Sequence, residues 1–419
     1  MSTEVKGWVN ARRIVGGIVF LEVIPSVSIK PVTVVIKKSE NPEAWKIAKR
    51  IKVGSAVRVY GEYVLEGKSK RGIEFIPSCI EVLSTPRDAL PYDPLGKTPV
   101  LFDTKIKYRY LMLRTPKERA LFRIRATLLK YARRFLEEKG FLEVQTPKIV
   151  GAGAEGGATL FKLDYFGRQA FLAQSPQLYK QMLMSSLTGV YEITPYFRAE
   201  QHHTTRHLNE SWGIDVEMGF IEGMEDVMKV LEELVIYVIK NVRNECSEEL
   251  EQLGVDLTVP RTPVPRISYE EALNLLEKEG CQVKWGLDLS DRDEKKLGEI
   301  MLEKGYELYF ITNYPWAIKP FYVMREGAEL SRSFDLDYRG IEICSGGQRE
   351  HRYDRLIENM KVKGLNPEDF NFYLDAFKYG MPPHGGFGLG VERLLMKMLR
   401  AENIREVILF VRDIHRLVP

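Results

Sequence analysis

The sequence lacks long hydrophobic runs and closely spaced cysteines. No stretch of its 419 residues approaches the length of about eighteen uninterrupted apolar residues that a membrane-spanning helix needs. Its N-terminal residues carry charge and are followed by no apolar signal region. The few cysteines are too far apart for a zinc ribbon or a disulfide scaffold. They are Cys79, Cys246, Cys281 and Cys344. We therefore expect a protein of the reducing cytoplasm that does not span a membrane.

The sequence also has little excess of either charge, since the formal net charge is only +3. This small positive excess is unevenly distributed along the chain. Residues 1–83 hold 14 Lys and Arg against 8 Asp and Glu, whereas the remainder holds 47 against 50. A basic N-terminal module either binds a polyanion or has an ordinary solvated basic surface. Apolar residues make up 44% of the chain and charged residues 28%, which predicts two or three packed domains.

Residues 1–83 read as five short strands and one short helix, which predicts a small Greek-key barrel of the OB-fold type. The expected strands are 5–9, 17–23, 32–36, 56–63 and 72–82, and the expected helix is 44–50. Residues 84–116 are predicted to be a linker, because three prolines at 86, 91 and 94 disfavour a helix at its start.

Residues 117–419 show the patterns of a mostly antiparallel sheet covered by helices, so the predicted fold class is α+β. Apolar residues recur at helical spacing over 117–139, and a second helix is expected at 225–242. Residues 214–220 alternate between apolar side chains and carboxylates, as in a strand with one packed face. A stretch rich in Glu and Lys around 245–305 predicts a helical insertion whose charges form a solvated face.

Three segments carry the residues best suited to chemistry. A glycine-rich loop at 151–161 has Glu155 at its centre, and a carboxylate there is suited to hold an ammonium group. Lys180 follows in a polar run at a predicted junction of strand and helix, where it either binds an anion or is merely exposed. Residues 385–393 form a tight turn that aims Arg393 into a site. They lack the last glycine of a dinucleotide fingerprint and the surrounding βαβ unit.

Residues 197–208 place Arg198 and Glu200 on one face and add a second arginine and three histidines. The histidines allow a metal site as one interpretation, but no helical pair of ligands with a third ligand or cysteine accompanies them. Polyphosphate suits Arg198, Arg206 and His207 better, because the rigid guanidinium fork matches phosphate oxygens.

In order, these segments resemble the motifs of class II aminoacyl-tRNA synthetases, and the whole chain resembles the aspartyl-tRNA synthetases of the compact archaeal type. Residues 141–147, which end at Pro147, resemble motif 1 of that family, where the proline marks the dimer interface. Residues 197–207 resemble motif 2, and residues 386–393 resemble motif 3. The resemblance implies an antiparallel catalytic sheet, a homodimer, an OB-fold domain that reads the anticodon, and catalysis that uses ATP and Mg²⁺ to charge the 3′ end of tRNA.

The same resemblance implies a role for individual residues. Arg198 and Arg393 would be catalytic, with Arg198 on the α-phosphate and Glu200 reading the adenine amino group. Mg²⁺ would be held by the hard oxygen ligands of Glu342 and Ser345. The residues implied to contact ATP are Arg198, Glu200, Arg206, His207, Leu208, Glu342 and Arg393.

Aspartate would be chosen by Lys180 and Arg349, which match the lysine and arginine that clasp the substrate's side-chain carboxylate in aspartyl enzymes. Asparaginyl enzymes lack that lysine, and we expect an amide substrate to leave two buried cations without a counter-charge. Asp215 would orient Lys180, and Glu155 with Gln177 would hold the ammonium group. The implied aspartate contacts are Glu155, Gln177, Lys180, Arg198, Asp215, Ser345 and Arg349.

The barrel departs from the family pattern. Phe20 matches an aromatic that stacks on an anticodon base, but the glutamine that reads the central base in relatives has no counterpart. Two positions that differ between enzymes specific for tRNA(Asp) and those that also charge tRNA(Asn) align to Asn10 and Lys70, so tRNA(Asn) remains open as a second substrate. The rival interpretations are an asparaginyl-type synthetase, a tRNA-independent asparagine synthetase, and a non-enzymatic paralogue.

Overall fold

The computed structural model describes residues 3–65, 73–151, 159–201 and 204–419. Contacts within the chain group it into two compact units: Met1–Ile124 with Cys246–Asp256, and Arg125–Glu245 with Leu257–Pro419. Four residues singled out in the sequence lie outside the described part: Lys70, Glu155, His202 and His203. Within the described residues, no helix is long and apolar enough to cross a membrane.

Five strands of the first unit close into a barrel in the order β1-β2-β3-β5-β4, which confirms the predicted fold of this region. All neighbours pair antiparallel except β3 and β5, which are parallel. Helix α1 (Pro42–Ala48) stands between β3 and β4, with the Asn41 side chain accepting a hydrogen bond from the Ala44 amide at 3.0 Å. The strands are β1 (Thr3–Val15), β2 (Ile18–Pro25), β3 (Val32–Lys37), β4 (Ala56–Leu65) and β5 (Ile73–Ser84).

Strand β1 extends well beyond the predicted residues 5–9 because it pairs with two neighbours in succession. Its first half pairs with β4, and its second half continues alongside β2 as far as the turn at Gly16, after a bulge between Val9 and Ala11. The bulge interrupts the apolar alternation that the sequence pattern relied on. The barrel core is filled by alternating apolar residues such as Val9, Leu21 and Phe75, and α1 closes it with Ala44 and Ala48.

Residues 85–101, all within the described part of the chain, form neither helix nor strand. The next elements are α2 (Phe102–Lys107), α3 (Arg109–Met112) and the long helix α4 (Pro116–Glu138). Helix α4 corresponds to the predicted helix at 117–139 and begins at a proline, which is favourable in a first helical turn.

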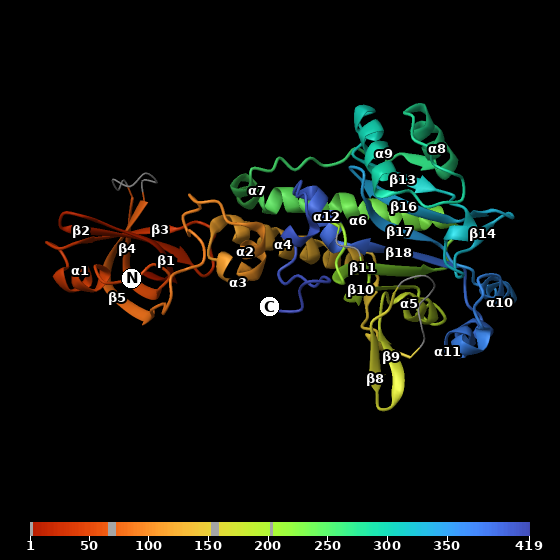
Figure 1. Cartoon of the computed structure of the whole chain (residues 1–419), viewed down its shortest axis with the longest axis horizontal. Helices are drawn as coiled ribbons and strands as arrows, with labels where there is room; N and C mark the ends of the chain where they lie inside the picture. Colours follow the sequence, from red (N-terminus) through yellow and green to blue (C-terminus); the bar gives the residue numbers. More distant parts are fainter. Residues whose placement is uncertain (1–2, 66–72, 152–158, 202–203) are drawn as a thin grey trace. The chain divides into compact units, whose positions relative to one another are not determined.

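The second unit is built on an eight-stranded sheet in the order β12-β13-β16-β17-β18-β11-β10-β6 (Figure 1). Only the outermost pairs, β12 with β13 and β10 with β6, are parallel, so the predicted antiparallel architecture is confirmed. The strands are β6 (Leu142–Glu143), β10 (Gly189–Phe197), β11 (Glu210–Gly219), β12 (Arg266–Ser268), β13 (Leu308–Thr312), β16 (Ser333–Tyr338), β17 (Glu342–Gln348) and β18 (His384–Gly390).

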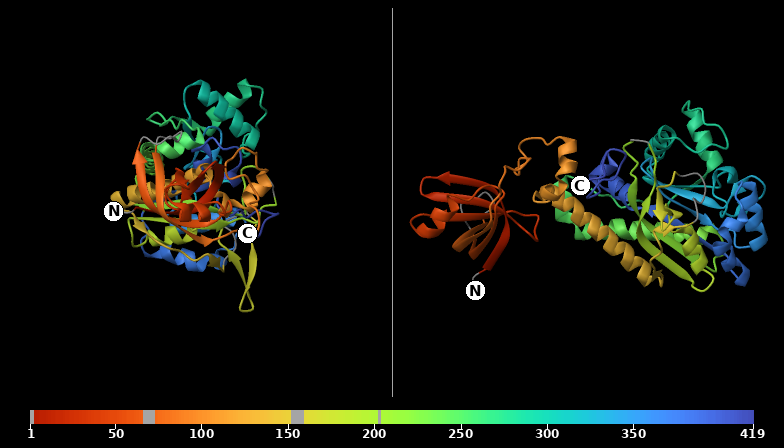
Figure 2. Two further views of the ribbon diagram at one scale, coloured as in Figure 1. Left: turned by 90° about the vertical axis from the view of Figure 1, so that its left-hand side faces the viewer. Right: turned by 60° about the horizontal axis from the view of Figure 1, so that its bottom comes forward.

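Smaller elements surround this sheet. A three-stranded sheet contains β7 (Ile149–Val150), β9 (Arg168–Leu172) and β8 (Lys162–Tyr165), and its β8–β9 hairpin extends away from the large sheet (Figures 1 and 2). Strands β14 (Arg325–Glu326) and β15 (Leu330–Ser331) pair with each other. The shorter helical elements of this unit are α5 (Gln177–Leu183), α10 (Tyr353–Val362), α11 (Asn371–Leu374), η1 (Trp316–Ile318), η2 (Pro367–Phe370), η3 (Asp375–Tyr379) and η4 (Ile404–Glu406).

Two helices pack on the central strands of the large sheet. Helix α6 (Met224–Glu245) contacts β17 and β18 and buries a stripe of apolar residues that recur at helical spacing. Helix α12 (Val391–Met398) directly follows β18 and contacts β11, β17 and β18. The sequence prediction of a helix at 225–242 is therefore confirmed.

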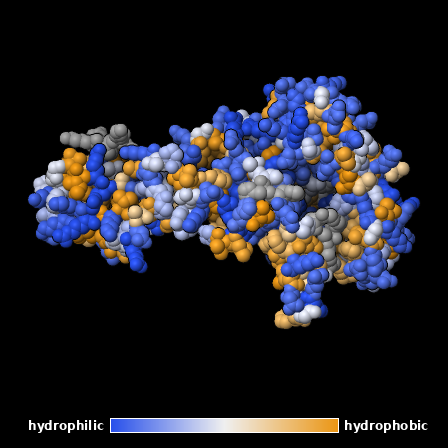
Figure 3. Space-filling view, viewed as in Figure 1, coloured by the Kyte–Doolittle hydropathy of each residue, from blue (hydrophilic) through white to orange (hydrophobic). Residues whose placement is uncertain are grey.

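The predicted helical insertion contains α7 (Ser247–Leu253), α8 (Tyr269–Lys278) and α9 (Asp291–Glu303). Helices α8 and α9 pack together on β12 and β13 around a core of their own, and their outer surface is mostly hydrophilic (Figure 3). Both begin with a capping box, Ser268 with Glu271 and Ser290 with Asp293. The start of α9 is thus firmly anchored, and it lies beside the candidate site described next.

Candidate active site

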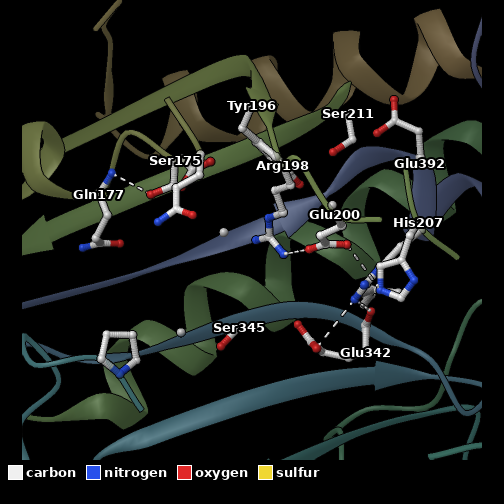
Figure 4. Close-up of a pocket in the computed structure, with 18 of the residues that line it drawn as sticks. Ser175, Gln177, Tyr196, Arg198, Glu200, His207, Ser211, Glu342, Ser345 and Glu392 are labelled. Carbon is white, nitrogen blue, oxygen red and sulfur yellow. Dashed lines mark hydrogen bonds and ion pairs between the residues drawn. The ribbon is translucent and has the colours of Figure 1, made fainter. Parts of the chain in front are cut away.

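A cavity of about 300 Å³ in the second unit is lined by residues of β10, β11, β17 and β18, among others. Most of the residues singled out in the sequence line it together, although they come from segments far apart in the chain (Figure 4). These are Gln177, Arg198, Glu200, Arg206, His207, Leu208, Asp215, Glu342, Ser345, Arg349 and Arg393. Lys180 is not part of the lining but is buried and donates a hydrogen bond to Asp215, which is.

Arg198 and Glu200 follow the end of β10 and point into the cavity (Figure 4). Arg198 Nη1 lies 3.8 Å from Glu200 Oε1, and the Arg198 side chain is 46% exposed, so its guanidinium has room to meet an anion. The Asn209 side chain donates hydrogen bonds to the carbonyl oxygens of Arg198 at 2.7 Å and Glu200 at 3.0 Å. One amide therefore holds the backbone of both residues.

The segment from Thr204 to Leu208 forms the next wall. The Thr204 hydroxyl lies 2.6 Å from His207 Nδ1, and His207 Nε2 is 4.0 Å from Glu200. Burial lowers the pKa of His207 below its ordinary value although Glu200 opposes this shift, so the neutral imidazole is favoured. Arg405 donates to the Thr204 carbonyl at 2.7 Å, which ties the segment to the C-terminal region.

Arg206 is held from outside the cavity by two carboxylates of α9. Its Nη1 lies 2.7 Å from Asp291, and its Nη2 donates to Glu294. Burial raises the pKa of Glu294, as does the nearby Glu342, whereas Arg206 lowers it. The sequence prediction that the charges of this stretch form a solvated face is wrong for Glu294, whose side chain is 14% exposed. Nothing in the local charge pattern marked it, because its partner lies 88 residues away.

Arg393 enters the cavity from the first turn of α12, as the turn at 385–393 predicts. Its Nη1 donates to the Glu342 carbonyl oxygen at 2.9 Å and lies 3.6 Å from the Glu342 carboxylate. The neighbouring Glu392 also lines the cavity and accepts hydrogen bonds from Arg125 at 2.6 Å and from the Trp212 amide at 2.9 Å. These contacts fix the start of α12 and hence the direction of Arg393.

Glu342 and Ser345 lie on β17 and present oxygen atoms to the cavity (Figure 4). Cys344 between them is buried, and burial raises the pKa of its thiol well above the ordinary value, so it stays protonated. Among the described residues, no group of three or more His, Cys, Asp or Glu is arranged to hold a metal ion. A carboxylate and a hydroxyl nevertheless suit Mg²⁺, which takes few protein ligands and completes its shell with water and phosphate oxygens.

The closed end of the cavity is a network of buried charges around Lys180. Lys180 Nζ lies 3.1 Å from Asp215 and 3.4 Å from Glu217, and it also donates to the carbonyl oxygens of Val216 and Phe387. Arg349 Nε donates to Glu217 at 3.0 Å. The expectation that Lys180 and Arg349 have no counter-charge without a substrate carboxylate is wrong, because Glu217 supplies one.

A second layer of polar residues supports this network. Gln177 accepts a hydrogen bond from Arg349 at 3.2 Å. Beneath it, His384 Nδ1 donates to the Pro382 carbonyl at 2.9 Å, and its Nε2 lies 3.1 Å from the amide nitrogen of Gln181. Burial lowers the pKa of His384 to about 4, so the ring is neutral and accepts a hydrogen bond from Gln181. Sequence reasoning assigned no role in the site to Gln181, His384 or Glu217.

The residues predicted to contact tRNA or a second subunit lie elsewhere. Asn10 is buried in the first unit, and its amide donates to the Arg114 carbonyl at 3.2 Å. Phe20 is half-buried on the barrel beneath the guanidinium of Arg13, which lies 5.0 Å from the ring centre. Pro147 is exposed between β6 and β7. Lys70 and Glu155 lie outside the described residues.

Comparison with known proteins gives consistent matches. The profile of the family "tRNA synthetases class II (D, K and N)" matches residues 102–414. An aspartate–tRNA(Asp) ligase of Pyrococcus abyssi is 50% identical over 99% of this chain and 96% of its own length. An aspartate–tRNA(Asp/Asn) ligase of Methanopyrus kandleri is 50% identical over 99% of this chain and 95% of its own length.

Solved structures show the same likeness over the whole length. The asparaginyl-tRNA synthetase of Pyrococcus horikoshii in complex with asparaginyl-adenylate matches with a TM-score of 0.90 and 36% identity, over 100% of this chain and 96% of the other. The aspartyl-tRNA synthetase of Entamoeba histolytica matches with a TM-score of 0.88 and 31% identity, over 100% of this chain and 90% of the other.

Proposed function

Because the chain belongs to the class II tRNA synthetases of the D, K and N group, we propose that it uses ATP to join L-aspartate to the 3′ end of tRNA(Asp). The observation that carries this proposal is a single cavity with two different ends. Arg198 and Arg393 stand where they can meet phosphate, and the buried pair of Lys180 and Arg349 lies at the closed end, suited to a carboxylate side chain.

The first step of the proposed reaction forms aspartyl-adenylate. An oxygen of the substrate's α-carboxylate attacks the α-phosphorus of ATP, the bond from this phosphorus to the bridging oxygen breaks, and pyrophosphate leaves. Negative charge grows on the α-phosphate oxygens, and the Arg198 guanidinium stabilises it there. Glu200 binds the adenine amino group, and Arg206, His207, Leu208 and Arg393 hold the remainder of the nucleotide.

Mg²⁺ is proposed to neutralise phosphate charge when it is bound, with Glu342 and Ser345 as its protein ligands. In the second step, the terminal hydroxyl of tRNA attacks the carbonyl carbon of the adenylate, and AMP leaves as aspartyl-tRNA forms. Gln177 and Glu155 are proposed to hold the substrate's ammonium group, and Asp215 orients Lys180, to which it is already hydrogen-bonded at 3.1 Å.

The tRNA and subunit partners follow from the family. We propose that the barrel binds the tRNA anticodon and that Asn10, Phe20 and Lys70 contribute to its recognition. We also propose that the chain acts in the cytoplasm as a homodimer whose interface includes the region of Pro147. The domain assignment proposed with this function is 1–83 for anticodon binding, 84–116 as a linker, and 117–419 for catalysis. A relative named for both tRNA(Asp) and tRNA(Asn) makes tRNA(Asn) a second proposed substrate.

The test measures the two steps separately with the full-length protein. Pyrophosphate exchange into ATP should depend on aspartate and proceed far more slowly with asparagine. Transcripts of tRNA(Asp) and tRNA(Asn) are then charged with labelled aspartate. Charging of tRNA(Asp) alone indicates a specific enzyme, whereas charging of both indicates a non-discriminating one. Exchange that depends on asparagine instead of aspartate would overturn the proposal in favour of an asparaginyl-type enzyme.

A further inference from the structure

Helix α9 reaches the candidate active site through one arginine. Asp291 and Glu294, one turn apart on α9, both bind the guanidinium of Arg206, which lines the cavity. Glu294 does not line the cavity itself, so any influence it has on a bound molecule passes through Arg206. The two carboxylates and the arginine come from distant parts of the chain but lie in the same compact unit.

The inner carboxylate is the stronger partner. The side chains of Arg206 and Glu294 are 9% and 14% exposed, whereas Asp291 is 59% exposed. Solvent and salt screen the outer pair much more than the inner one. A charge-assisted hydrogen bond between two shielded groups also restricts the arginine to one orientation. Glu294 is therefore the residue that determines where the guanidinium lies.

Glu294 is itself held in place by backbone packing. Helix α9 approaches the turn before β17 so closely that a Cβ atom at Gly298 would lie 2.3 Å from the Gly340 Cα. The Glu342 amide lies 3.4 Å from Glu294 Oε2, within reach of a weak hydrogen bond. Leu297, Ile300 and Met301 anchor α9 in the core of the insertion. The same carboxylate thus contacts Arg206 and the backbone of Glu342, two of the residues assigned to ATP and its metal ion.

From this geometry we infer that Glu294 is a positioning residue for the phosphate end of ATP. It holds the Arg206 guanidinium at the cavity wall before the nucleotide binds. The inference rests on the proposed function and adds to it a role for the insertion. A guanidinium has five N–H donors, and the contacts with α9 leave some of them for phosphate oxygens. An arginine ordered in advance loses less conformational entropy when ATP binds.

A different effect of Glu294 is also physically reasonable and predicts the opposite result. A carboxylate close to the phosphate site repels phosphate, and it competes with phosphate for Arg206. If that effect were the larger one, removing Glu294 would tighten ATP binding. The direction of the change in the KM for ATP therefore distinguishes positioning from competition.

The experiment compares Glu294→Ala and Glu294→Gln with the wild-type protein in aspartate-dependent pyrophosphate exchange. The alanine variant should raise the KM for ATP about tenfold, which corresponds to about 1.4 kcal/mol. The glutamine variant keeps an acceptor oxygen for Arg206 and should raise it less. The KM for aspartate should stay within about twofold in both, because Lys180 and Arg349 are held by Asp215 and Glu217 of β11 and not by Arg206. A general structural defect would not separate the two substrates in this way.

A double-mutant cycle tests whether the effect passes through Arg206. Arg206→Ala alone should raise the KM for ATP, and adding Glu294→Ala to it should change the KM by less than about twofold. Glu299→Gln is the matched control, because Glu299 lies on the same helix, is 52% exposed and faces Lys296. This variant should behave as the wild type does.

Three results would overturn the inference: an unchanged or lower KM for ATP in both Glu294 variants, equal increases in the KM values for ATP and aspartate, or a full effect of Glu294→Ala in the Arg206→Ala background. Failure of the proposed function is recognised separately, because the wild-type protein would then show no aspartate-dependent exchange at all.

Discussion

Glu217 and Arg349 form a buried ion pair at the closed end of the candidate active site, with 3.0 Å between Arg349 Nε and Glu217 Oε1. The same carboxylate lies 3.4 Å from Lys180. Although burial raises it, the two cations hold the pKa of Glu217 below its ordinary value, so the group remains ionised. A buried negative charge therefore already lies next to the cations proposed to bind aspartate. Selection of aspartate must then depend on how the side-chain carboxylate of the substrate shares Lys180 and Arg349 with the carboxylate of Glu217.

Replacing Glu217 with glutamine should strongly destabilise the protein. The change removes the carboxylate that pairs with buried Arg349 at 3.0 Å, and breaking a buried pair costs about 3 kcal/mol or more. Thermal unfolding checks this, with Glu358→Gln as the control because its ion pair with Arg355 is exposed. Saturating aspartate should recover more stability in Glu217→Gln than in the wild type, because the substrate carboxylate replaces the missing charge. Equal stabilisation of the two proteins by aspartate would contradict this account.

Replacing Lys180 with leucine should abolish aspartate-dependent pyrophosphate exchange. The variant loses the cation proposed to bind the substrate's side chain, and it leaves Asp215 and Glu217 facing each other without the ammonium group between them. Activity is measured as kcat/KM for aspartate, and circular dichroism shows whether the variant is folded. Lys361→Leu on the exposed side of α10 is the control and should retain activity. Turnover at the wild-type level in Lys180→Leu would disprove the assignment of this lysine.

The sequence predicted the parts of the site that follow local rules. A glycine-rich turn before a helix indicated the position of Arg393, and alternation over 214–220 indicated that Asp215 and Glu217 share one face of a strand. These patterns span a few residues and depend on the backbone period alone. The five-stranded barrel and the antiparallel sheet were predicted for the same reason, since each strand carries its own alternation.

The contacts between distant segments were not predictable in this way. Glu217 meets Arg349 because β11 and β17 both pair with β18, which brings residues 217 and 348 opposite Gly386 and Gly385. The pairing depends on strand order, and no local pattern encodes strand order. Glu294 resembles its neighbours on α9 in charge and spacing, so only the folded chain distinguishes the one that faces Arg206. The prediction of a solvated face is correct for Glu299, whose side chain is 52% exposed. It is wrong for Glu294, which lies on a different face of the same helix and is 14% exposed.

Gly386 should be intolerant of any side chain. A Cβ atom there would lie 2.1 Å from the Val216 carbonyl oxygen and 2.2 Å from Glu217 Oε2, so the two central strands would have to separate. We expect Gly386→Ala to lower the free energy of unfolding by about 1–3 kcal/mol and to reduce aspartate activation, because it displaces Glu217. Gly390→Ala on the same strand is the matched control, with its nearest neighbour at 3.6 Å. Similar unfolding temperatures for the two variants would contradict the close packing described here.

His384 should make the protein less stable as the pH falls. The folded-state pKa of His384 is lowered to about 4 by burial, against an ordinary value of 6.5. Between pH 6.5 and pH 4, His384 therefore binds a proton in the unfolded chain but stays neutral in the folded chain. The resulting stability is fully present above pH 6.5 and is lost as the pH falls towards 4, by about 2 kcal/mol between pH 7 and pH 5. His384→Gln should remove this part of the pH dependence. Unfolding curves of both proteins at the two pH values provide the measurement, and equal losses in wild type and variant would show that His384 does not titrate as its burial requires.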